Sequence, residues 1–281
     1  MDLWVESNGG ANIGSHFMIN SGDGTRFDLD IERAPFELLH NPPPEFWRHY
    51  LGHLIDVDND GDLDLALGQL RDDHFTHVNQ FSIVLINDGT GHIPTRVELQ
   101  HPRFYRGYTA VQGIADLDFN RDGWRDLALL HTRNDDLSTD EETGVLTFTG
   151  RYVQALVNRG DLTFSDETRT RIVQGPTRAQ RFPNGEALYN AGGLVMRDLN
   201  RDGCLDLVLA ATWGPIRRQS PIAYRNNGRG QFRPLPHKQF QRYPGDLNPG
   251  YGTWPADVNG DGLRRRLGWK SATSALHQAA A

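Results

Sequence analysis

A short acidic motif occurs three times in the chain and begins a fourth time. It places Asp or Asn at the first, third and fifth positions, Gly at the sixth and Asp at the ninth. Oxygen ligands at alternate positions around one glycine turn are how a short loop surrounds a hard cation, and calcium is the natural ion for them. The fourth copy lacks the ninth-position acid. The candidate ligands are Asp56, Asp58, Asp60 and Asp64; Asp118, Asn120, Asp122 and Asp126; Asp198, Asn200, Asp202 and Asp206; and Asp257, Asn259 and Asp261.

These loops are expected to join strands rather than helices. The opening of the motif is shared with the EF-hand, which needs a glutamate at the twelfth position. This chain has Leu67, Leu129 and Leu209 there, and an apolar, strand-like run follows each ninth-position aspartate. The alternative is an acidic turn without metal, in which the packed carboxylates would repel one another because no cation offsets their charge.

A second motif, a turn of asparagine and glycine before an apolar residue, occurs four times, at Asn20–Gly24, Asn87–Gly91, Asn158–Gly160 and Asn226–Gly230. Together the two motifs resemble the FG-GAP or VCBS repeat of integrin-alpha-like β-propellers. The resemblance covers almost the whole chain, and it implies an all-β fold of four-stranded antiparallel blades. Members of that family include adhesion modules, lectins and polysaccharide-degrading enzymes, so the resemblance leaves the function open.

Bulk composition agrees with an all-β repeat array. Only 37% of the 281 residues are hydrophobic and 30 are glycine, which suits many short strands and tight turns. The chain has 29 Lys and Arg against 36 Asp and Glu, for a net charge of -7, so no basic excess points to general nucleic-acid binding. No apolar run approaches the roughly 18 residues of a membrane span.

Cysteine content and the N-terminus bear on location. A single cysteine, Cys204 at the seventh position of the third loop, excludes an internal disulfide framework. We expect it to be a partly exposed bystander. The N-terminus shows no charged-then-apolar leader. Calcium loops of this kind nonetheless favour an extracellular, cell-surface or periplasmic setting, because such modules hold calcium only at about 10⁻⁴–10⁻³ M.

The ninth-position aspartates place the repeats along the chain. Asp64 and Asp126 are 62 residues apart, and counting back the same distance from Asp64 reaches Asp2, so we expect the chain to begin within a loop. Residues 3–7, 16–20 and 25–31 then read as the last three strands of a first blade. Residues 134–142 form an acidic insertion that we expect on the surface. We expect blades at about residues 1–45, 50–105, 108–180 and 189–240, a partial blade at 251–265 and an atypical tail at 266–281.

The two ends of the chain leave two architectures open. The C-terminal part supplies a first strand and half a loop, and the N-terminal part supplies three strands, so together they would complete one blade. The chain is then either a small ring of four blades closed by its termini or an open fragment of a larger propeller. We favour the open fragment because the run Arg264–Arg266 spoils the closing strand. Open blade edges would promote self-association.

Basic and aromatic residues gather on the connections expected opposite the calcium loops. Arginine can hold carboxylates or sulfates through paired hydrogen bonds, and aromatic faces can stack on sugar rings. We therefore expect an anionic polysaccharide or a protein ligand as the partner; an ordinary solvated rim is the alternative. The candidate ligand face consists of Arg103, Tyr105, Arg106, Trp213, Arg217, Arg218, Arg242 and Trp254.

No constellation of residues nominates a catalytic site. The carboxylate pairs are assigned to metal, so they cannot serve as the acid and base of a glycosidase. The chain has no G-x-S-x-G elbow and no H-E-x-x-H motif. A polysaccharide lyase is the alternative, with a base among His74, His77, His101 and Tyr105. We expect a calcium-binding module for extracellular binding or adhesion rather than an enzyme.

Overall fold

The described part of the chain is almost entirely β-structure. The computed structural model describes residues 3–5, 16–30, 48–70, 81–102, 108–134, 150–174, 193–209, 223–235, 253–256 and 265–268. These residues form antiparallel sheets, and their one helix is α2, Thr168–Arg171. The expected all-β class with four-stranded antiparallel sheets is confirmed.

Three sheets have four strands each, and within each sheet the strands pair in chain order. This order needs only short connections between neighbouring strands, as in an antiparallel meander. The sheets consist of β4 (Arg48–Ile55), β5 (Asp64–Leu70), β6 (Ile83–Ile86) and β7 (Thr95–Glu98); of β8 (Tyr108–Leu117), β9 (Asp126–Asn134), β10 (Gly150–Asn158) and β11 (Phe164–Asp166); and of β12 (Leu194–Arg197), β13 (Asp206–Leu209), β14 (Ala223–Asn226) and β15 (Phe232–Pro234).

Two smaller sheets precede and follow these three. The first contains β1 (Leu3–Val5), β2 (His16–Asn20) and β3 (Phe27–Asp30), and the last pairs β16 (Thr253–Ala256) with β17 (Arg265–Gly268). The structure differs here from the sequence-based expectation that the arginine run spoils this strand and that a tail without strands follows. Thr253 lies opposite Gly268 and Ala256 opposite Arg265, and such backbone pairing does not require a ninth-position aspartate.

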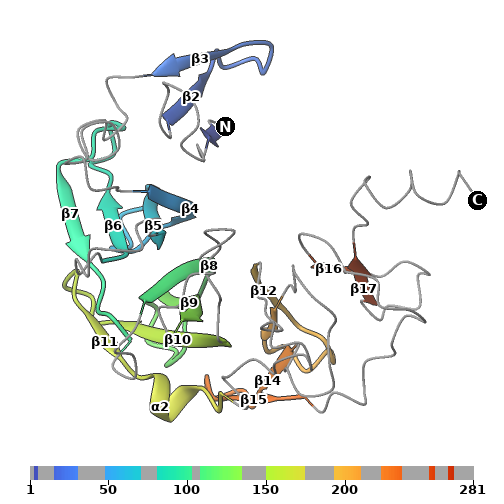
Figure 1. Ribbon diagram of the computed structural model, residues 1–281. Coiled ribbons are helices and arrows are strands. Elements are labelled where there is room, and N and C mark those ends of the chain that lie inside the picture. Colours follow the sequence, from blue (N-terminus) through green and yellow to red (C-terminus); the bar gives the residue numbers. More distant parts are fainter. Residues whose placement is uncertain are drawn as a thin grey trace, which may run out of the picture.

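The sheets follow one another along an arc (Figure 1). In each four-stranded sheet the first strand lies on the inner side of the arc and the fourth on the outer side, as Figure 1 shows for β8 and β11. The three acidic motifs connect first strands to second strands, from β4 to β5, β8 to β9 and β12 to β13. The arrangement therefore repeats the same loop at the same place in three successive sheets.

Alternating side chains on the central strand β9 pack against different neighbouring sheets. On β9, Leu127 and Leu129 belong to the core shared with the β4–β7 sheet, whereas Ala128 and Leu130 belong to the core shared with the β12–β15 sheet. All four are fully buried. Because side chains on a strand point to opposite faces in turn, a sheet buried on both faces needs apolar residues at consecutive positions. The run at 127–130 meets this requirement.

Close approach between sheets depends on two glycines. A Cβ added to Gly68 on β5 would lie 2.7 Å from Cγ1 of Val111 on β8. A Cβ on Gly113 would lie 2.6 Å from the backbone nitrogen of Leu194 on β12. Gly113 also follows a shift of register between β8 and β9, which bends the strand at this point. The spacing of the three sheets is thus set partly by missing side chains.

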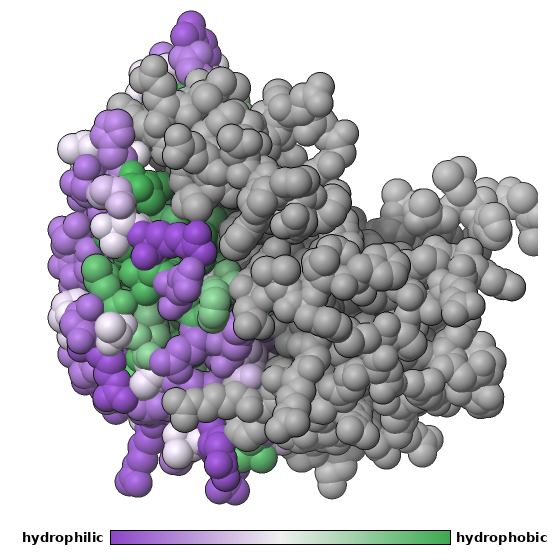
Figure 2. Space-filling view, turned by 60° about the vertical axis from the view of Figure 1, so that its left-hand side comes forward, coloured by the Kyte–Doolittle hydropathy of each residue, from purple (hydrophilic) through white to green (hydrophobic). Residues whose placement is uncertain are grey.

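Hydrophilic residues border an apolar area on the outer side of the arc. Figure 2 brings the outer side of the arc forward and shows apolar surface bordered by hydrophilic residues. Val97 and Leu162 are partly buried against the core between the first two four-stranded sheets. Large apolar side chains exposed among the described residues are single ones, Leu54, Leu63, Val173 and Leu205. Scattered apolar residues of this kind are normal on protein surfaces.

We predict that Gly113→Ala lowers the free energy of unfolding by about 1–3 kcal/mol, because the new methyl group meets backbone atoms of Leu194 that cannot easily move. Urea denaturation measures the change. Gln112→Ala, at the neighbouring partly exposed position, is the matched control and should change stability by about 0.5 kcal/mol or less. Equal stability of Gly113→Ala and the wild-type protein would show that the sheets can separate without cost.

Candidate metal centres

The three described loops share one backbone shape. The fourth and sixth positions adopt left-handed conformations in each, with φ of 58° and 95° at Asn59 and Gly61, for example. A Cβ on Gly61, Gly123 or Gly203 would meet no atom within 4 Å. The sixth position therefore favours glycine because of its backbone conformation, not because of crowding.

The ninth-position aspartate closes each loop. Asp64, Asp126 and Asp206 are almost completely buried. In the first loop, one carboxylate oxygen of Asp64 accepts the backbone N–H of Val57 at 2.8 Å and the other accepts the N–H of Asn87 at 2.9 Å. Asp126 and Asp206 make the same two contacts in their own sheets. One side chain thus ties the loop entrance to the turn between the third and fourth strands.

Burial disfavours the charged form of these aspartates. It raises the pKa of Asp64 and of Asp126 to about 6, although two backbone hydrogen bonds act in the opposite direction. The pKa of Asp206 is raised for the same reason. Neighbouring loop aspartates add to the effect through charge repulsion. A divalent cation would relieve this repulsion and favour the ionised carboxylates.

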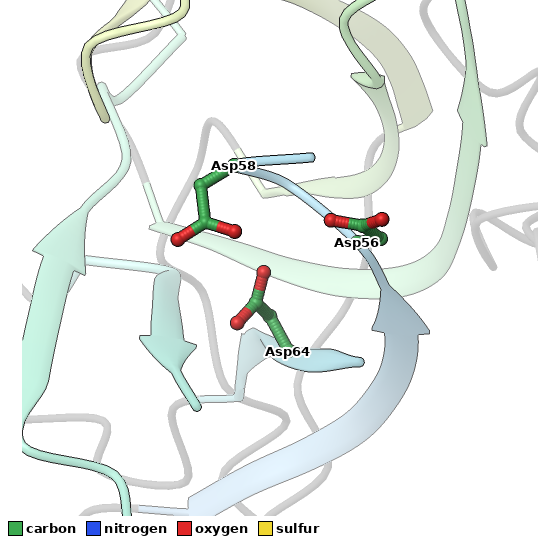
Figure 3. A group of neighbouring side chains, drawn as sticks. All are labelled: Asp56, Asp58 and Asp64. Atoms are coloured by element: carbon green, nitrogen blue, oxygen red, sulfur yellow. The ribbon is translucent and has the colours of Figure 1, made fainter. Parts of the chain in front are cut away.

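The first loop brings three carboxylates together. One oxygen each of Asp56, Asp58 and Asp64 lies within 4.8 Å of the other two, and Figure 3 shows the side chains of Asp58 and Asp64 directed toward each other. Oδ1 of Asp56 and Oδ1 of Asp58 are buried without a hydrogen-bond partner. Burial also raises the pKa of Asp58. Unsatisfied buried oxygens of this kind fit a hard cation such as Ca²⁺.

The second and third loops are arranged differently. The first-position aspartates, Asp118 and Asp198, accept backbone N–H groups from the fourth and sixth positions of their own loops. At the third position, Asn120 donates its amide to Asp122 at 2.7 Å, and the same bond links Asn200 to Asp202. Asp58 occupies this position in the first loop and has no N–H to donate. Among the described residues, converging carboxylates are therefore confined to the first loop.

The number of charged residues also differs among the loops, and the first loop is the most negative. Between its first and ninth positions, the first loop contains five aspartates and no arginine. The second contains three aspartates with Arg121 and Arg125, and the third contains three aspartates with Arg201. Because calcium affinity rises with the number of charged ligands, the first loop should bind most tightly.

Turn asparagines brace the loops from outside, a role that sequence reasoning missed. The side-chain amides of Asn87, Asn158 and Asn226 donate to the backbone carbonyl at the eighth position of the loop in the same sheet. Their Oδ1 atoms accept N–H groups of the turn glycines, such as Gly160 at 3.0 Å. The fixed asparagine-to-glycine spacing was visible in the sequence, but only the fold shows that the turn holds the loop.

The side chain at the seventh position of each loop lies against a glycine of the following turn. A Cβ on Gly89 would lie 2.5 Å from Oδ2 of Asp62, and one on Gly228 would lie 3.3 Å from Sγ of Cys204. Cys204 is partly exposed, in accord with the sequence-based expectation. Burial, followed by the charge of Asp202, raises its pKa, so the thiol stays protonated at neutral pH.

Neighbouring sheets are joined at the level of the loops. Asn158 donates its amide to the carbonyl of Val57 in the first loop at 2.7 Å, and Asn59 donates to the carbonyl of Gly123 in the second at 3.1 Å. Nε2 of His53 on β4 lies 2.7 Å from Oδ1 of Asp116 on β8. The loops are therefore part of the contact between sheets.

Several predicted site residues lie outside the described residues. These are the fourth-loop ligands Asp257, Asn259 and Asp261 and most of the candidate ligand face, while Trp254 is described only as part of strand β16. Among the candidate bases, His101 packs against Phe81 with ring centroids 4.4 Å apart, and burial lowers its pKa. His131, which lies on β9, is buried and contacts Gln154 at 2.9 Å, so it belongs to the core.

A comparison with protein-family models matches residues 198–264 to the FG-GAP-like repeat. The chain carries an FG-GAP-like repeat. The matched stretch begins at Asp198, the first position of the third loop. It includes β13, β14, β15 and β16 and extends into the fourth acidic motif, which starts at Asp257. This confirms the resemblance drawn from the two motifs. A comparison with curated proteins gives no match.

FG-GAP-like repeats often bind calcium, in agreement with the acidic group at Asp56, Asp58 and Asp64. The loops of the first and second four-stranded sheets have the same closing hydrogen bonds as the loop in the matched repeat. Within the described residues, no helix has the length and apolar character needed to cross a membrane.

We predict that Asp58→Asn weakens the tightest calcium-binding step by about tenfold or more, because it removes a charged ligand and supplies an amide that can bond Asp60. Isothermal titration with calcium measures the step. The matched variant is Asn120→Asp, which should strengthen binding at the second loop because it restores a third-position carboxylate. If both substitutions leave the titration unchanged, the third position does not control affinity.

We also predict that calcium affinity falls as the pH drops below about 6, because protons then compete for Asp64 and Asp126. In the metal-free protein, a raised carboxyl pKa means that the folded chain holds the proton more tightly than the unfolded chain. The resulting stabilisation is present below about pH 4 and is lost as the pH rises through about 6. Melting temperatures with calcium and with chelator across this range measure both effects. A calcium-induced rise in melting temperature that is equal at about pH 5 and about pH 7.5 would contradict the prediction.

Proposed function

We propose that the chain is a calcium-binding β-propeller repeat module that acts in extracellular binding or adhesion. The observation that carries this proposal is the group of Asp56, Asp58 and Asp64, with two buried oxygens that lack hydrogen-bond partners. The arc of antiparallel sheets with first strands on its inner side supports a propeller arrangement. The FG-GAP-like match supports both parts of the proposal.

Calcium would act as a structural ion. In each loop it would be held by the carboxylate or amide oxygens of the first, third, fifth and ninth positions and by a backbone carbonyl near the seventh. Because the ninth-position aspartate also bonds the turn asparagine, the ion would fix the loop and the turn together. The links from Asn158 to Val57 and from Asn59 to Gly123 would pass this restraint to the next sheet.

An extracellular setting follows from the supply of calcium. Extracellular modules of this kind hold calcium at about 10⁻⁴–10⁻³ M, a concentration that is maintained outside cells. We propose an anionic polysaccharide as the ligand class, since arginine forks match carboxylate and sulfate groups. The candidate face with Arg103, Arg106 and Arg217 remains a prediction.

The proposal predicts that calcium raises the melting temperature and that a chelator lowers it. A site saturated at about 100 times its dissociation constant adds roughly 2.7 kcal/mol to the free energy of unfolding. Differential scanning calorimetry with calcium, with magnesium and with EDTA measures the effect. Magnesium is the control ion, because it demands a smaller octahedral site. A melting temperature that is the same in calcium and in EDTA would refute a structural role for the loops.

The same samples test the propeller arrangement. Small-angle scattering in the presence of calcium distinguishes a compact disc or an arc of sheets from an extended string of separate sheets. Either compact shape agrees with a propeller or with part of one. An extended string would mean that the contacts between sheets do not persist in solution.

A further inference from the structure

Val57 lies between two candidate ligands of the first loop, and the peptide groups on both sides of it are hydrogen-bonded. The N–H that follows Asp56 donates to Oδ2 of Asp64 at 2.8 Å. The carbonyl that precedes Asp58 accepts the side-chain amide of Asn158 at 2.7 Å. Val57 itself is buried in the core between the first two four-stranded sheets. The residue that separates two of the three converging carboxylates is therefore held by the third carboxylate and by the neighbouring sheet.

Asn158 is a fixed point rather than a mobile side chain. It ends strand β10 in the β8–β11 sheet and is only 1% exposed. Besides its bond to Val57, its amide donates to the carbonyl of Arg125 in the second loop at 3.1 Å, and its Oδ1 accepts the N–H of Gly160 at 3.0 Å. Because both ends of the amide are engaged, any shift of the side chain breaks at least one bond.

Asn59 supplies a second link on the other side of Asp58. This fourth-position residue has a left-handed backbone with φ of 58°, and its amide donates to the carbonyl of Gly123 in the second loop at 3.1 Å. Both neighbours of Asp58 are thus bonded to the β8–β11 sheet or its loop. Oδ1 of Asp58 is buried without a hydrogen-bond partner, so the backbone on either side is what directs this oxygen.

The second loop lacks the same connection. There the carbonyl of Phe119 takes the place of that of Val57, and it accepts the guanidinium group of Arg171 at 3.0 Å instead of an amide. The turn asparagine of the following sheet, Asn226, donates to the carbonyl of Leu205 in its own loop at 3.0 Å, and none of its described contacts reaches another loop. Among the described residues, an amide from the next sheet thus supports the loop whose carboxylates converge.

We propose that Asn158 is a positioning residue for the calcium site of the first loop, so that two neighbouring sheets, and not one repeat, form the unit that binds the ion. The inference rests on the proposed calcium binding and concerns the first loop alone. Asn158 acts through the backbone of Val57 and not as a ligand. A loop that is already held in its binding conformation loses less conformational freedom when the ion binds, which raises affinity.

Replacing Asn158 by serine tests this role. The shorter hydroxyl side chain can still accept the N–H of Gly160, but it cannot reach Val57. Asn158→Ser should weaken the tightest calcium-binding step by about threefold to tenfold, as expected for the loss of one hydrogen bond that supports the bound state. Isothermal titration of the full chain measures the step. The matched control is Asn226→Ser, which alters the same position of the third four-stranded sheet and should leave this step unchanged.

A second variant removes the other link at an exposed position. Asn59→Gly deletes the amide that bonds Gly123, and glycine adopts the left-handed conformation of this residue without strain. It should weaken the same calcium-binding step by about twofold to fivefold. Because the side chain of Asn59 is exposed, this variant decides the question if Asn158→Ser does not fold.

Terbium luminescence separates positioning from a general loss of stability. Tb³⁺ is a hard cation that accepts the oxygen ligands of calcium, and its emission lifetimes in H₂O and D₂O report how much water it binds. Terbium added below one equivalent should retain more bound water in Asn158→Ser than in the wild-type protein, because a carboxylate that is no longer held leaves a coordination position open. A merely structural role would lower the melting temperature in EDTA and leave both the dissociation constant and the bound water unchanged.

The outcomes distinguish failure of this inference from failure of the proposed function. If the wild-type protein binds neither calcium nor terbium, the proposed function fails. If it binds both ions but Asn158→Ser and Asn59→Gly leave the dissociation constant and the bound water unchanged, the positioning role is refuted and the calcium module stands. Equal weakening by Asn226→Ser would also refute it, whereas weakening by Asn158→Ser alone would support it.

Discussion

The contact on which the loops depend is the buried aspartate at the ninth position. Its two oxygens accept one N–H from the loop entrance and one from the turn asparagine, as Asp126 does with Phe119 and Asn158. Without it, two buried backbone donors would lose their acceptor, at a cost of about 1–3 kcal/mol for each unsatisfied group. Loop shape is therefore secured by the same side chain that would hold the metal, and the backbone is similar in all three loops whether or not the remaining carboxylates converge.

The residue at the third position determines whether the loop carboxylates are hydrogen-bonded to a side chain or face one another. An asparagine there, as at Asn120 and Asn200, supplies a donor that occupies the fifth-position carboxylate. An aspartate, as at Asp58, leaves oxygens facing one another with repulsion that a cation relieves. Sites of one backbone design can thus range from preorganised for calcium to satisfied without it. The difference arises from the side-chain amide of asparagine, which replaces a carboxylate at the third position.

The loops, the strands that flank them and the turns were predictable because each has a local pattern. Alternation and consecutive apolar positions marked strands such as β9, and the acidic spacing marked Asp64 and its counterparts. The bracing by Asn158 across two sheets was not predictable, since it depends on which sheets become neighbours. Strand β17 was missed because backbone pairing can proceed without the side-chain signals of the repeat.

The first and second loops are each braced by the sheet that follows them in the chain. The turn of the β8–β11 sheet supports the first loop through Asn158 and Val57, and the β12–β15 sheet abuts the second loop where Gly230 leaves room for the carbonyl of Phe119. Because Asn59 of the first loop also donates to the carbonyl of Gly123 in the second, neighbouring loops support each other. Loss of one sheet would therefore weaken the loops on both sides of it. In such an array the stability of each loop depends on the presence of the neighbouring sheets.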